Sequence, residues 1–118
     1  MKMFSFDDYL IANYLGDNSD QLALALQERV GGEIYAVHNS LIYGPMHYVL
    51  RKEDIYVDIE GVWTESELLE KWYSYKLEVS LDNQDIAYQL MPYHMVELPD
   101  VSEEACRIAN KVASSLFQ

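Results

Sequence analysis

Basic residues are scarce in this sequence. Its 118 residues include 8 lysines and arginines against 20 aspartates and glutamates, which gives a formal net charge of −12 and an isoelectric point near 4.4. Such a charge repels the phosphates of nucleic acids and anionic lipids, so direct binding to either is disfavoured. The charge favours a basic protein as partner, although it would also serve solubility alone.

Cysteine and long apolar runs are also nearly absent. Cys106 is the single thiol, so no disulfide can form within the chain, and nothing points to an oxidising compartment. No apolar run approaches the length of a membrane-spanning helix, and Asp7 and Asp8 lie where a signal peptide would need its apolar segment. We therefore expect a cytoplasmic protein that is neither exported by that route nor inserted into a membrane.

Apolar and aromatic residues, in contrast, are plentiful. Half of the residues are hydrophobic and 13% are aromatic, including 10 tyrosines. This composition differs from that of disordered chains, so the chain should fold. Its length is that of one domain, which we assign to residues 1–118.

Apolar residues at intervals of three and four predict helices near both ends of the chain. The first covers about residues 6–15, and the second ends at Gly31-Gly32. These glycines follow a helix and therefore cap it, whereas a phosphate-binding loop would precede one. A capping box at residues 64–67 begins a third helix, and Ser102 caps a last one.

Alternating apolar residues predict strands in the middle of the chain. The segments "EIYAVHNS", "MHYVLR" and "IYVDIE" are the candidates. From residue 75 to residue 96 the signals are weaker: "YKLEVSL" fits a strand or a loop, "DNQDIAYQL" a short turn of helix, and "YHMVEL" a terminal strand. The predicted class is α+β, with an antiparallel sheet of about three to five strands packed against the N-terminal and C-terminal helices.

The central hairpin carries a histidine and an aspartate. If Leu50 pairs with Ile55 across the loop "RKED", His47 lies directly opposite Asp58, with Cβ atoms about 5 Å apart. An imidazole and a carboxylate at that spacing can hydrogen-bond, as in the pairs that orient a catalytic histidine. A shift of one residue would place them on opposite faces. On hairpin geometry alone, a solvated cross-strand pair is the commoner outcome.

The surrounding motifs resemble a known family. The stretches "SDQLALALQERVGGEIYAV" and "MHYVLRKEDIYVDIEGVWTESELLEKW" are similar to those of small bacterial and phage proteins of papain-like fold, relatives of cysteine peptidases and peptidoglycan-cleaving amidases. The resemblance covers roughly residues 18–72. It implies a papain-like fold in which His47 matches the general base and Asp58 the residue that orients it.

The cysteine nucleophile of that family is missing. Where it should open the second helix, this sequence has Asp20, and a carboxylate cannot replace a thiolate in peptide hydrolysis. Negative charge at a helix N-terminus is nevertheless stabilising by about 0.3–1 kcal/mol. Our hypothesis is that Asp20, His47 and Asp58 form a vestigial ion-pair cluster; the alternative is that Asp20 is an exposed first-turn anion. Cys106 fits a small buried hydrophobe better than a displaced nucleophile.

The histidines do not predict a metal site. His38, His47 and His94 could combine with acidic residues, but none of them shows the spacing of known metal-binding motifs. We therefore expect neither a metal nor a cofactor.

Tyrosines are candidates for contacts with a partner. Exposed tyrosine is common at protein-binding surfaces because it combines a large apolar ring with a polar tip. Among the tyrosines of the hairpin and the third helix, we assign this role to Tyr48, Tyr56 and Tyr73.

Taken together, the sequence predicts a non-enzymatic acidic binding protein that occupies a surface of a basic partner, such as a nucleic-acid-binding protein. In its small size, acidity and lack of the family's nucleophile it looks like the accessory and counter-defence proteins of phages and mobile elements, for example anti-CRISPR inhibitors. Two alternatives remain open. One is a hydrolase or transferase that uses His47 and Asp58 with a nucleophile other than cysteine or with an activated water; the other is a toxin-neutralising immunity protein.

Overall fold

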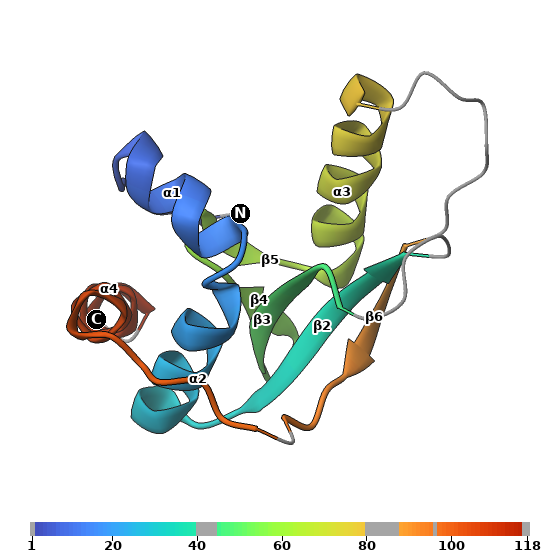
Figure 1. The fold of residues 1–118 in the computed structure, drawn as a ribbon. Helices are drawn as coiled ribbons and strands as arrows, with labels where there is room; N and C mark the ends of the chain where they lie inside the picture. Colours follow the sequence, from blue (N-terminus) through green and yellow to red (C-terminus); the bar gives the residue numbers. More distant parts are fainter. Residues whose placement is uncertain (1, 40–44, 80–87, 96, 117–118) are drawn as a thin grey trace.

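In the computed structural model of the chain, six strands of the described residues form one antiparallel sheet, and helices cover both of its faces (Figure 1). The structure describes residues 2–39, 45–79, 88–95 and 97–116; of these, the side chains of residues 2, 39 and 73–79 are outside the description. The helices are α1 (Asp8–Leu15), α2 (Ser19–Val30), α3 (Glu65–Val79) and α4 (Glu103–Leu116). The strands are β1 (Lys2–Met3), β2 (Glu33–Asn39), β3 (His47–Lys52), β4 (Ile55–Val57), β5 (Gly61–Trp63) and β6 (Tyr88–Pro92).

The strand order is β1-β5-β4-β3-β2-β6, and every neighbouring pair is antiparallel. Strands β2 to β5 follow one another as a meander, whereas β1 and β6 add to its two sides. This confirms the predicted α+β class with an antiparallel sheet. The described sheet has one strand more than the upper limit we expected, because the two-residue β1 pairs with β5.

Local capping signals define where the helices begin. The predicted capping box is confirmed: Thr64 Oγ1 accepts a hydrogen bond from the backbone N–H of Glu67 at 3.2 Å, and Glu67 Oε1 accepts from the N–H of Thr64 at 2.9 Å. The predicted cap of the last helix is also confirmed, since Ser102 Oγ accepts from the N–H of Ala105 at 3.1 Å.

Helix α2 ends at Gly31, as predicted. The N–H of Gly31 donates to Gln27 O at 2.9 Å, and Gly31 and Gly32 have φ angles of +74° and +96°. At Gly32 a Cβ atom would lie 2.5 Å from the backbone oxygen of Arg51 in β3. Glycine is therefore required here both for the positive φ and for the close approach of helix and strand.

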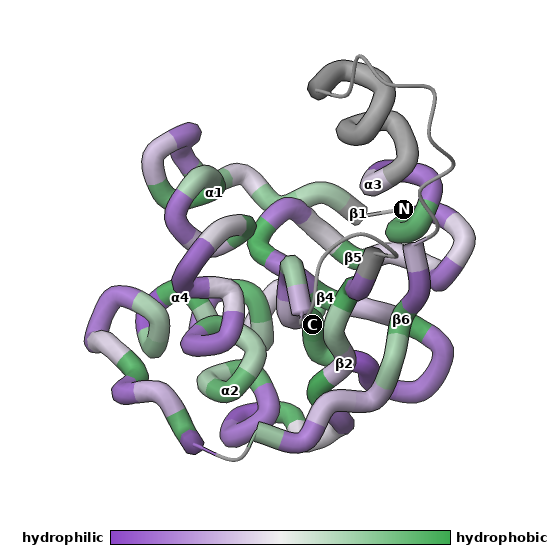
Figure 2. The backbone as a smooth tube through the Cα atoms, turned by 45° about the vertical axis from the view of Figure 1, so that its right-hand side comes forward, coloured by the Kyte–Doolittle hydropathy of each residue, from purple (hydrophilic) through white to green (hydrophobic). Residues whose placement is uncertain are grey.

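Each face of the sheet has its own apolar core. On one face, α1, α2 and α4 pack with Ile34, Leu50 and Val57; on the other, α3 packs with Val37, Val49 and Trp63. Hydrophobic and hydrophilic residues alternate along α1 and α4, as expected for helices with one buried side (Figure 2). Because successive strand residues point to opposite faces, neighbouring residues of β3 belong to different cores.

The predicted register of the central hairpin is wrong. Lys52 pairs with Ile55, and Leu50 pairs with Val57 rather than with Ile55. The loop is therefore the two residues Glu53 and Asp54, not the four of "RKED". Glu53 has a φ of +57°, which lets the chain reverse in a tight two-residue turn.

All three predictions for the segment after residue 75 need correction in the residues that the structure describes, and each also includes residues outside the description. Residues 75–79 continue α3 rather than forming a strand or loop. Of the segment expected to form a turn of helix, residues 82–87 lie outside the described part, and residues 88–90 belong to β6, which pairs with β2. The segment "YHMVEL" is not a strand in its described residues, because β6 ends at Pro92.

None of the described helices combines the length and the apolar character that crossing a membrane requires.

Candidate functional site

His47 and Asp58 contact each other in the interior of the protein. His47 is the first residue of β3, Asp58 follows β4, and His47 Nε2 lies 3.2 Å from Asp58 Oδ2. Their exposed fractions are 0% and 2%. The contact forms in a register other than the predicted one. Continuing the observed pairing sets Asp58 opposite Val49, which is the next residue along β3 on the same face as His47.

Both ring nitrogens of His47 face hydrogen-bond acceptors. Nδ1 lies 3.0 Å from the backbone oxygen of Leu15, the last residue of α1, and Nε2 faces the Asp58 carboxylate. A carbonyl and an ionised carboxylate accept hydrogen bonds and cannot donate them. Within the described residues, both nitrogens thus point at acceptors rather than at the hydroxyl or thiol of a nucleophile.

Asp58 is the central acceptor of this site. Its Oδ1 accepts hydrogen bonds from the backbone N–H groups of Glu60 at 2.9 Å and Gly61 at 3.1 Å, and from the indole N–H of Trp63 at 3.0 Å. Burial alone would raise the pKa of the Asp58 carboxyl. The hydrogen bond from the imidazole and a nearby ammonium group outweigh burial and hold this pKa well below its usual range. The carboxylate is therefore ionised at neutral pH.

The ammonium group belongs to Lys71 in α3, which sequence analysis missed. Lys71 Nζ lies 3.1 Å from Asp58 Oδ2 and also forms an ion pair with Glu60. It lies 4.8 Å from the ring centre of Trp63 and 5.8 Å from that of Trp72, within the range of cation–π attraction. We call His47, Asp58 and Lys71 the His47 cluster.

A signal for Lys71 was present in the helical spacing. Lys71 lies three residues after Leu68 and directly before Trp72, so the three side chains share the helix face that covers the sheet. The rings of Trp72 and His47 have centres 5.3 Å apart. A lysine beside two buried apolar residues of an amphipathic helix suggests that a buried carboxylate lies on the sheet that the helix covers.

Asp20 lies outside the His47 cluster. Among the described residues it makes no hydrogen bond or ion pair with His47 or Asp58, and its Oδ1 accepts from the N–H of Gln21 at 2.8 Å. The reason is geometric. Ser19 Oγ accepts from the N–H of Tyr48 at 3.1 Å, so the start of α2 packs beside Tyr48, whose side chain points to the opposite face of β3 from that of His47.

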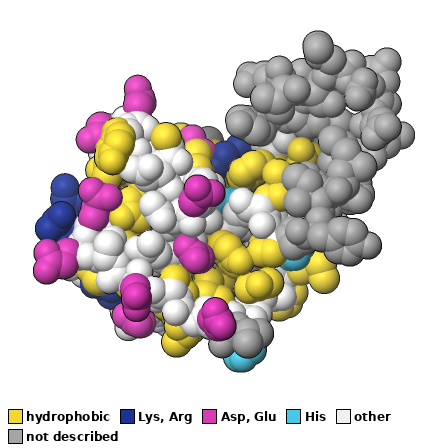
Figure 3. Space-filling model, in the orientation of Figure 1, with side chains coloured by type: hydrophobic (Ala, Val, Ile, Leu, Met, Phe, Trp, Pro, Cys, Tyr) yellow, Lys and Arg dark blue, Asp and Glu magenta, His cyan; other side chains and the backbone are white. Residues whose placement is uncertain are grey.

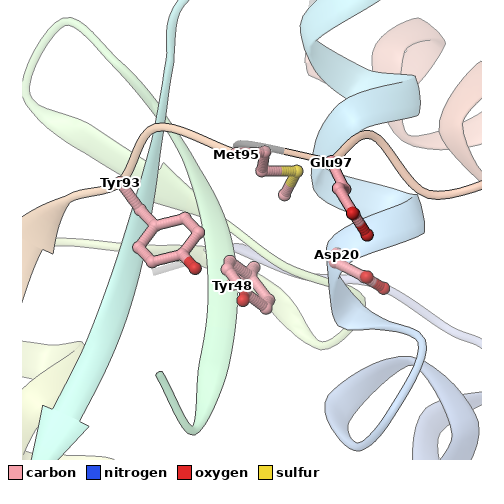
Figure 4. Close-up of a pocket in the computed structure, with 5 residues that line it drawn as sticks. All are labelled: Asp20, Tyr48, Tyr93, Met95 and Glu97. Atoms are coloured by element: carbon pink, nitrogen blue, oxygen red, sulfur yellow. The ribbon is translucent and has the colours of Figure 1, made fainter. Parts of the chain in front are cut away.

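Asp20 instead lines a pocket. The pocket has a volume of about 340 Å³, and its walls are Asp20, Tyr48, Tyr93, Met95 and Glu97 (Figure 4). We call it the Asp20 pocket. Burial, the neighbouring Tyr93 hydroxyl and the negative charge of Asp20 together raise the pKa of Tyr48 far above its usual value, so Tyr48 is neutral at physiological pH.

The three tyrosines expected to contact a partner have different surroundings. Tyr48 lines the Asp20 pocket and is half-buried. Tyr56 has an exposed fraction of 5% and packs edge-to-face on Tyr35, with ring centres 5.6 Å apart. It therefore belongs to the core of the α3 face, and its assignment to a binding surface was wrong. The side chain of Tyr73 lies outside the described residues.

Other reactive groups do not add to the site. Within the described ranges, no three or more side chains of His, Cys, Asp and Glu lie together in a way that could hold a metal ion. Cys106, which we expected to be a small buried hydrophobe, is a free thiol on α4 and is partly buried. Helix α4 packs on α2, on the face of the sheet opposite the His47 cluster.

Comparison of the chain with protein families, with curated proteins and with solved structures finds no match. The features of the molecule that bear on its function are the His47 cluster, the Asp20 pocket and the net charge.

Proposed function

We propose that the chain is a non-enzymatic acidic binding protein that occupies a surface of a basic partner. Its formal net charge of −12 supports this, because opposite charge steers two proteins together and raises their association rate. Acidic side chains are spread over the face shown in Figure 3, and basic ones are few there.

The observation that carries the proposal is the engagement of both His47 nitrogens. A histidine that acts as general base needs one free nitrogen within reach of a nucleophile. Nδ1 of His47 lies 3.0 Å from the backbone oxygen of Leu15 at the end of α1, Nε2 lies 3.2 Å from Asp58 Oδ2, and the exposed fraction of His47 is 0%. The contacts of His47 thus join α1, β3 and the turn after β4.

We further propose that the architecture is a degenerate papain-like fold. The support is the residue pattern of the two motif stretches together with a helix, α2, packed on an antiparallel sheet that brings His47 and Asp58 into contact. The role we favour is that of a cytoplasmic counter-defence protein of a phage or mobile element, such as an anti-CRISPR inhibitor. The reasons are this fold, the acidic net charge, and the presence of Asp20 where the family has its cysteine. A toxin-neutralising immunity protein would use the same charge complementarity.

A hydrolase or transferase is the competing function, and the His47–Asp58 contact is the observation in its favour. It requires that His47 release one of its two hydrogen bonds when substrate binds. The enzyme would then lose activity in His47→Gln, which keeps polar atoms at this position but cannot take up a proton near neutral pH.

The proposed function is tested by competition for an arginine-rich DNA-binding protein, protamine. Fluorescent duplex DNA is bound to protamine, and the folded protein is added at low and at high salt. We expect the protein to displace the DNA at low salt, and to do so less well at high salt because the attraction is electrostatic. Dodecaglutamate, which carries a comparable negative charge, is the matched control.

The control separates a shaped surface from charge alone. If the protein competes no better than dodecaglutamate, the proposal of a specific binding surface fails. Hydrolysis of peptide or peptidoglycan substrates by the native protein, lost in a folded His47→Gln variant, would instead establish the enzymatic alternative.

A further inference from the structure

The Asp20 pocket has the charge of a site for a cation. Two of its five lining residues are acidic, Asp20 and Glu97, and none is basic. The other three contribute two tyrosine rings and a thioether. Its volume of about 340 Å³ is at the lower end of the range for small-molecule sites, which suits one long side chain better than a larger ligand.

The pocket walls are fixed by hydrogen bonds from outside the pocket. Ser19, with an exposed fraction of 3%, binds the backbone of Tyr48 and so sets the start of α2 against β3. The N–H of Tyr93 donates to Ile34 O at 3.0 Å, which holds the segment after β6 on β2. Gln21 Oε1 accepts from the N–H of Ser102 at 3.1 Å and ties the end of the same segment to α2.

The two tyrosine rings form one aromatic wall. Their centres are 5.1 Å apart and their planes meet at 68°, an edge-to-face arrangement. Figure 4 shows Tyr48 and Tyr93 on one side of the pocket, and Asp20 and Glu97 on the other. A cation between these walls would meet aromatic rings and carboxylates together, and both can attract positive charge.

We infer that the Asp20 pocket binds the guanidinium group of an arginine side chain presented by a basic protein partner. This inference rests on the proposed function and locates its specific contact. Arginine fits better than lysine because a planar guanidinium can stack on a tyrosine ring while it donates in-plane hydrogen bonds to carboxylates. The Oδ1 atom of Asp20 is held by Gln21, so the carboxylate is already oriented to receive such donors.

The first test uses a small arginine probe. N-acetyl-arginine methylamide is titrated into the protein while the Met95 methyl group and the rings of Tyr48 and Tyr93 are followed by NMR. We expect saturable shifts of these signals with a Kd of about 1–10 mM, as expected for a single side chain. The citrulline analogue, which has nearly the same shape but no charge, should produce no saturable shift. Equal shifts with citrulline, or no saturable shift with arginine, would overturn the inference.

Matched variants separate the pocket from the overall charge. Asp20→Asn with Glu97→Gln removes two charges from the pocket, and Asp54→Asn with Glu70→Gln removes two from exposed positions in the β3–β4 turn and α3. We expect the pocket variant to weaken arginine binding roughly five- to tenfold and the surface variant to change it by less than about twofold. Equal weakening by both variants would assign the binding to general charge. Glu97→Gln alone is the second pocket variant if the double change perturbs α2.

The aromatic wall has its own matched pair. Tyr93→Phe keeps the ring and should retain arginine binding, whereas Tyr93→Leu removes the ring and should weaken it severalfold. Equal affinities of the two variants would exclude a role for the ring.

Failure of this inference can be told apart from failure of the proposed function. Arginine binding in the pocket without specific competition for protamine would support the site and refute the proposed function. In the other case, the protein competes specifically for protamine, the pocket variant competes equally well, and arginine does not bind. That result would support the proposed function and refute the arginine site.

Discussion

His47 and Asp58 contact each other in the interior of the protein: Nε2 and Oδ2 are 3.2 Å apart, and both side chains are almost fully withdrawn from solvent. The Asp58 carboxylate accepts hydrogen bonds from groups in β5, in α3 and in the turn after β4. Removing one partner from such a buried polar cluster leaves the remaining groups without compensation for their burial.

Asp58→Asn should be strongly destabilising. The variant keeps the shape of the side chain but removes the buried carboxylate that contacts His47 and Lys71, so we expect a loss of about 3–5 kcal/mol in the free energy of unfolding. Urea denaturation followed by tryptophan fluorescence measures it. The matched control is Asp54→Asn in the exposed hairpin turn, which should stay within about 0.5 kcal/mol of the native protein. A similar small effect of both changes would contradict the ion pair.

The stability of the protein should depend on pH because of the Asp58 carboxylate. The pKa of Asp58 in the folded protein lies below its ordinary value of 3.8, so the folded state favours the ionised form. The resulting stabilisation is fully present above about pH 5 and is lost as the pH falls through the ordinary value towards the folded pKa. The difference in unfolding free energy between the native protein and Asp58→Asn should therefore shrink below about pH 4. A difference that stays constant down to pH 2.5 would mean that this carboxyl is not ionised preferentially in the fold.

Ser19→Ala should loosen the junction between α2 and β3. Strand β4 pairs with β3 only from Leu50 onwards, so the N–H of Tyr48 depends on the Ser19 hydroxyl as its acceptor. Leaving that N–H without an acceptor should lower stability by about 1–2 kcal/mol and weaken arginine binding in the Asp20 pocket. Ser66→Ala, on an exposed position of α3, should do neither. Unchanged thermal unfolding of Ser19→Ala would show that the hydroxyl is not needed.

Alanine substitutions at the two adjacent glycines at the end of α2 should separate the effect of backbone strain from that of steric overlap. Alanine at Gly31 would have to adopt a φ of +74° but would meet no atom within 4 Å, so we expect a loss of about 1–3 kcal/mol. Alanine at Gly32 would face the same kind of strain and would also lie 2.5 Å from Arg51 O. Gly32→Ala should therefore unfold at a lower urea concentration than Gly31→Ala; the reverse order would show that β3 moves away easily.

The features predicted correctly from the sequence are local. The capping box at Thr64, the cap at Ser102 and the end of α2 at Gly31 each depend on residues within one helical turn. The contact of His47 with Asp58 was expected in the wrong register, because the tight turn depends on the positive φ of Glu53, a conformation that glutamate rarely adopts.

The missed features depend on tertiary packing. Asp20 lies away from the His47 cluster because its neighbour Ser19 makes the contact with β3, a choice that two adjacent polar residues do not reveal in sequence. Strand β6 pairs with β2, which is far away along the chain, so no short window signals it. The pocket that brings Asp20 together with Tyr93 could not be predicted for the same reason.

The place of β6 at the end of the strand order has a consequence for dynamics. Tyr93, Met95 and Glu97 follow β6, whereas Tyr48 and Asp20 belong to the meander and α2. An outer strand can detach from a sheet at a lower free energy than global unfolding requires. Detachment of β6 would thus dismantle the arginine site while the buried core on the α2 face of the sheet persists. Arginine binding and the pairing of β6 with β2 are then thermodynamically linked. A bound arginine should therefore slow amide hydrogen exchange in β6 and leave the exchange rate in β3 unchanged.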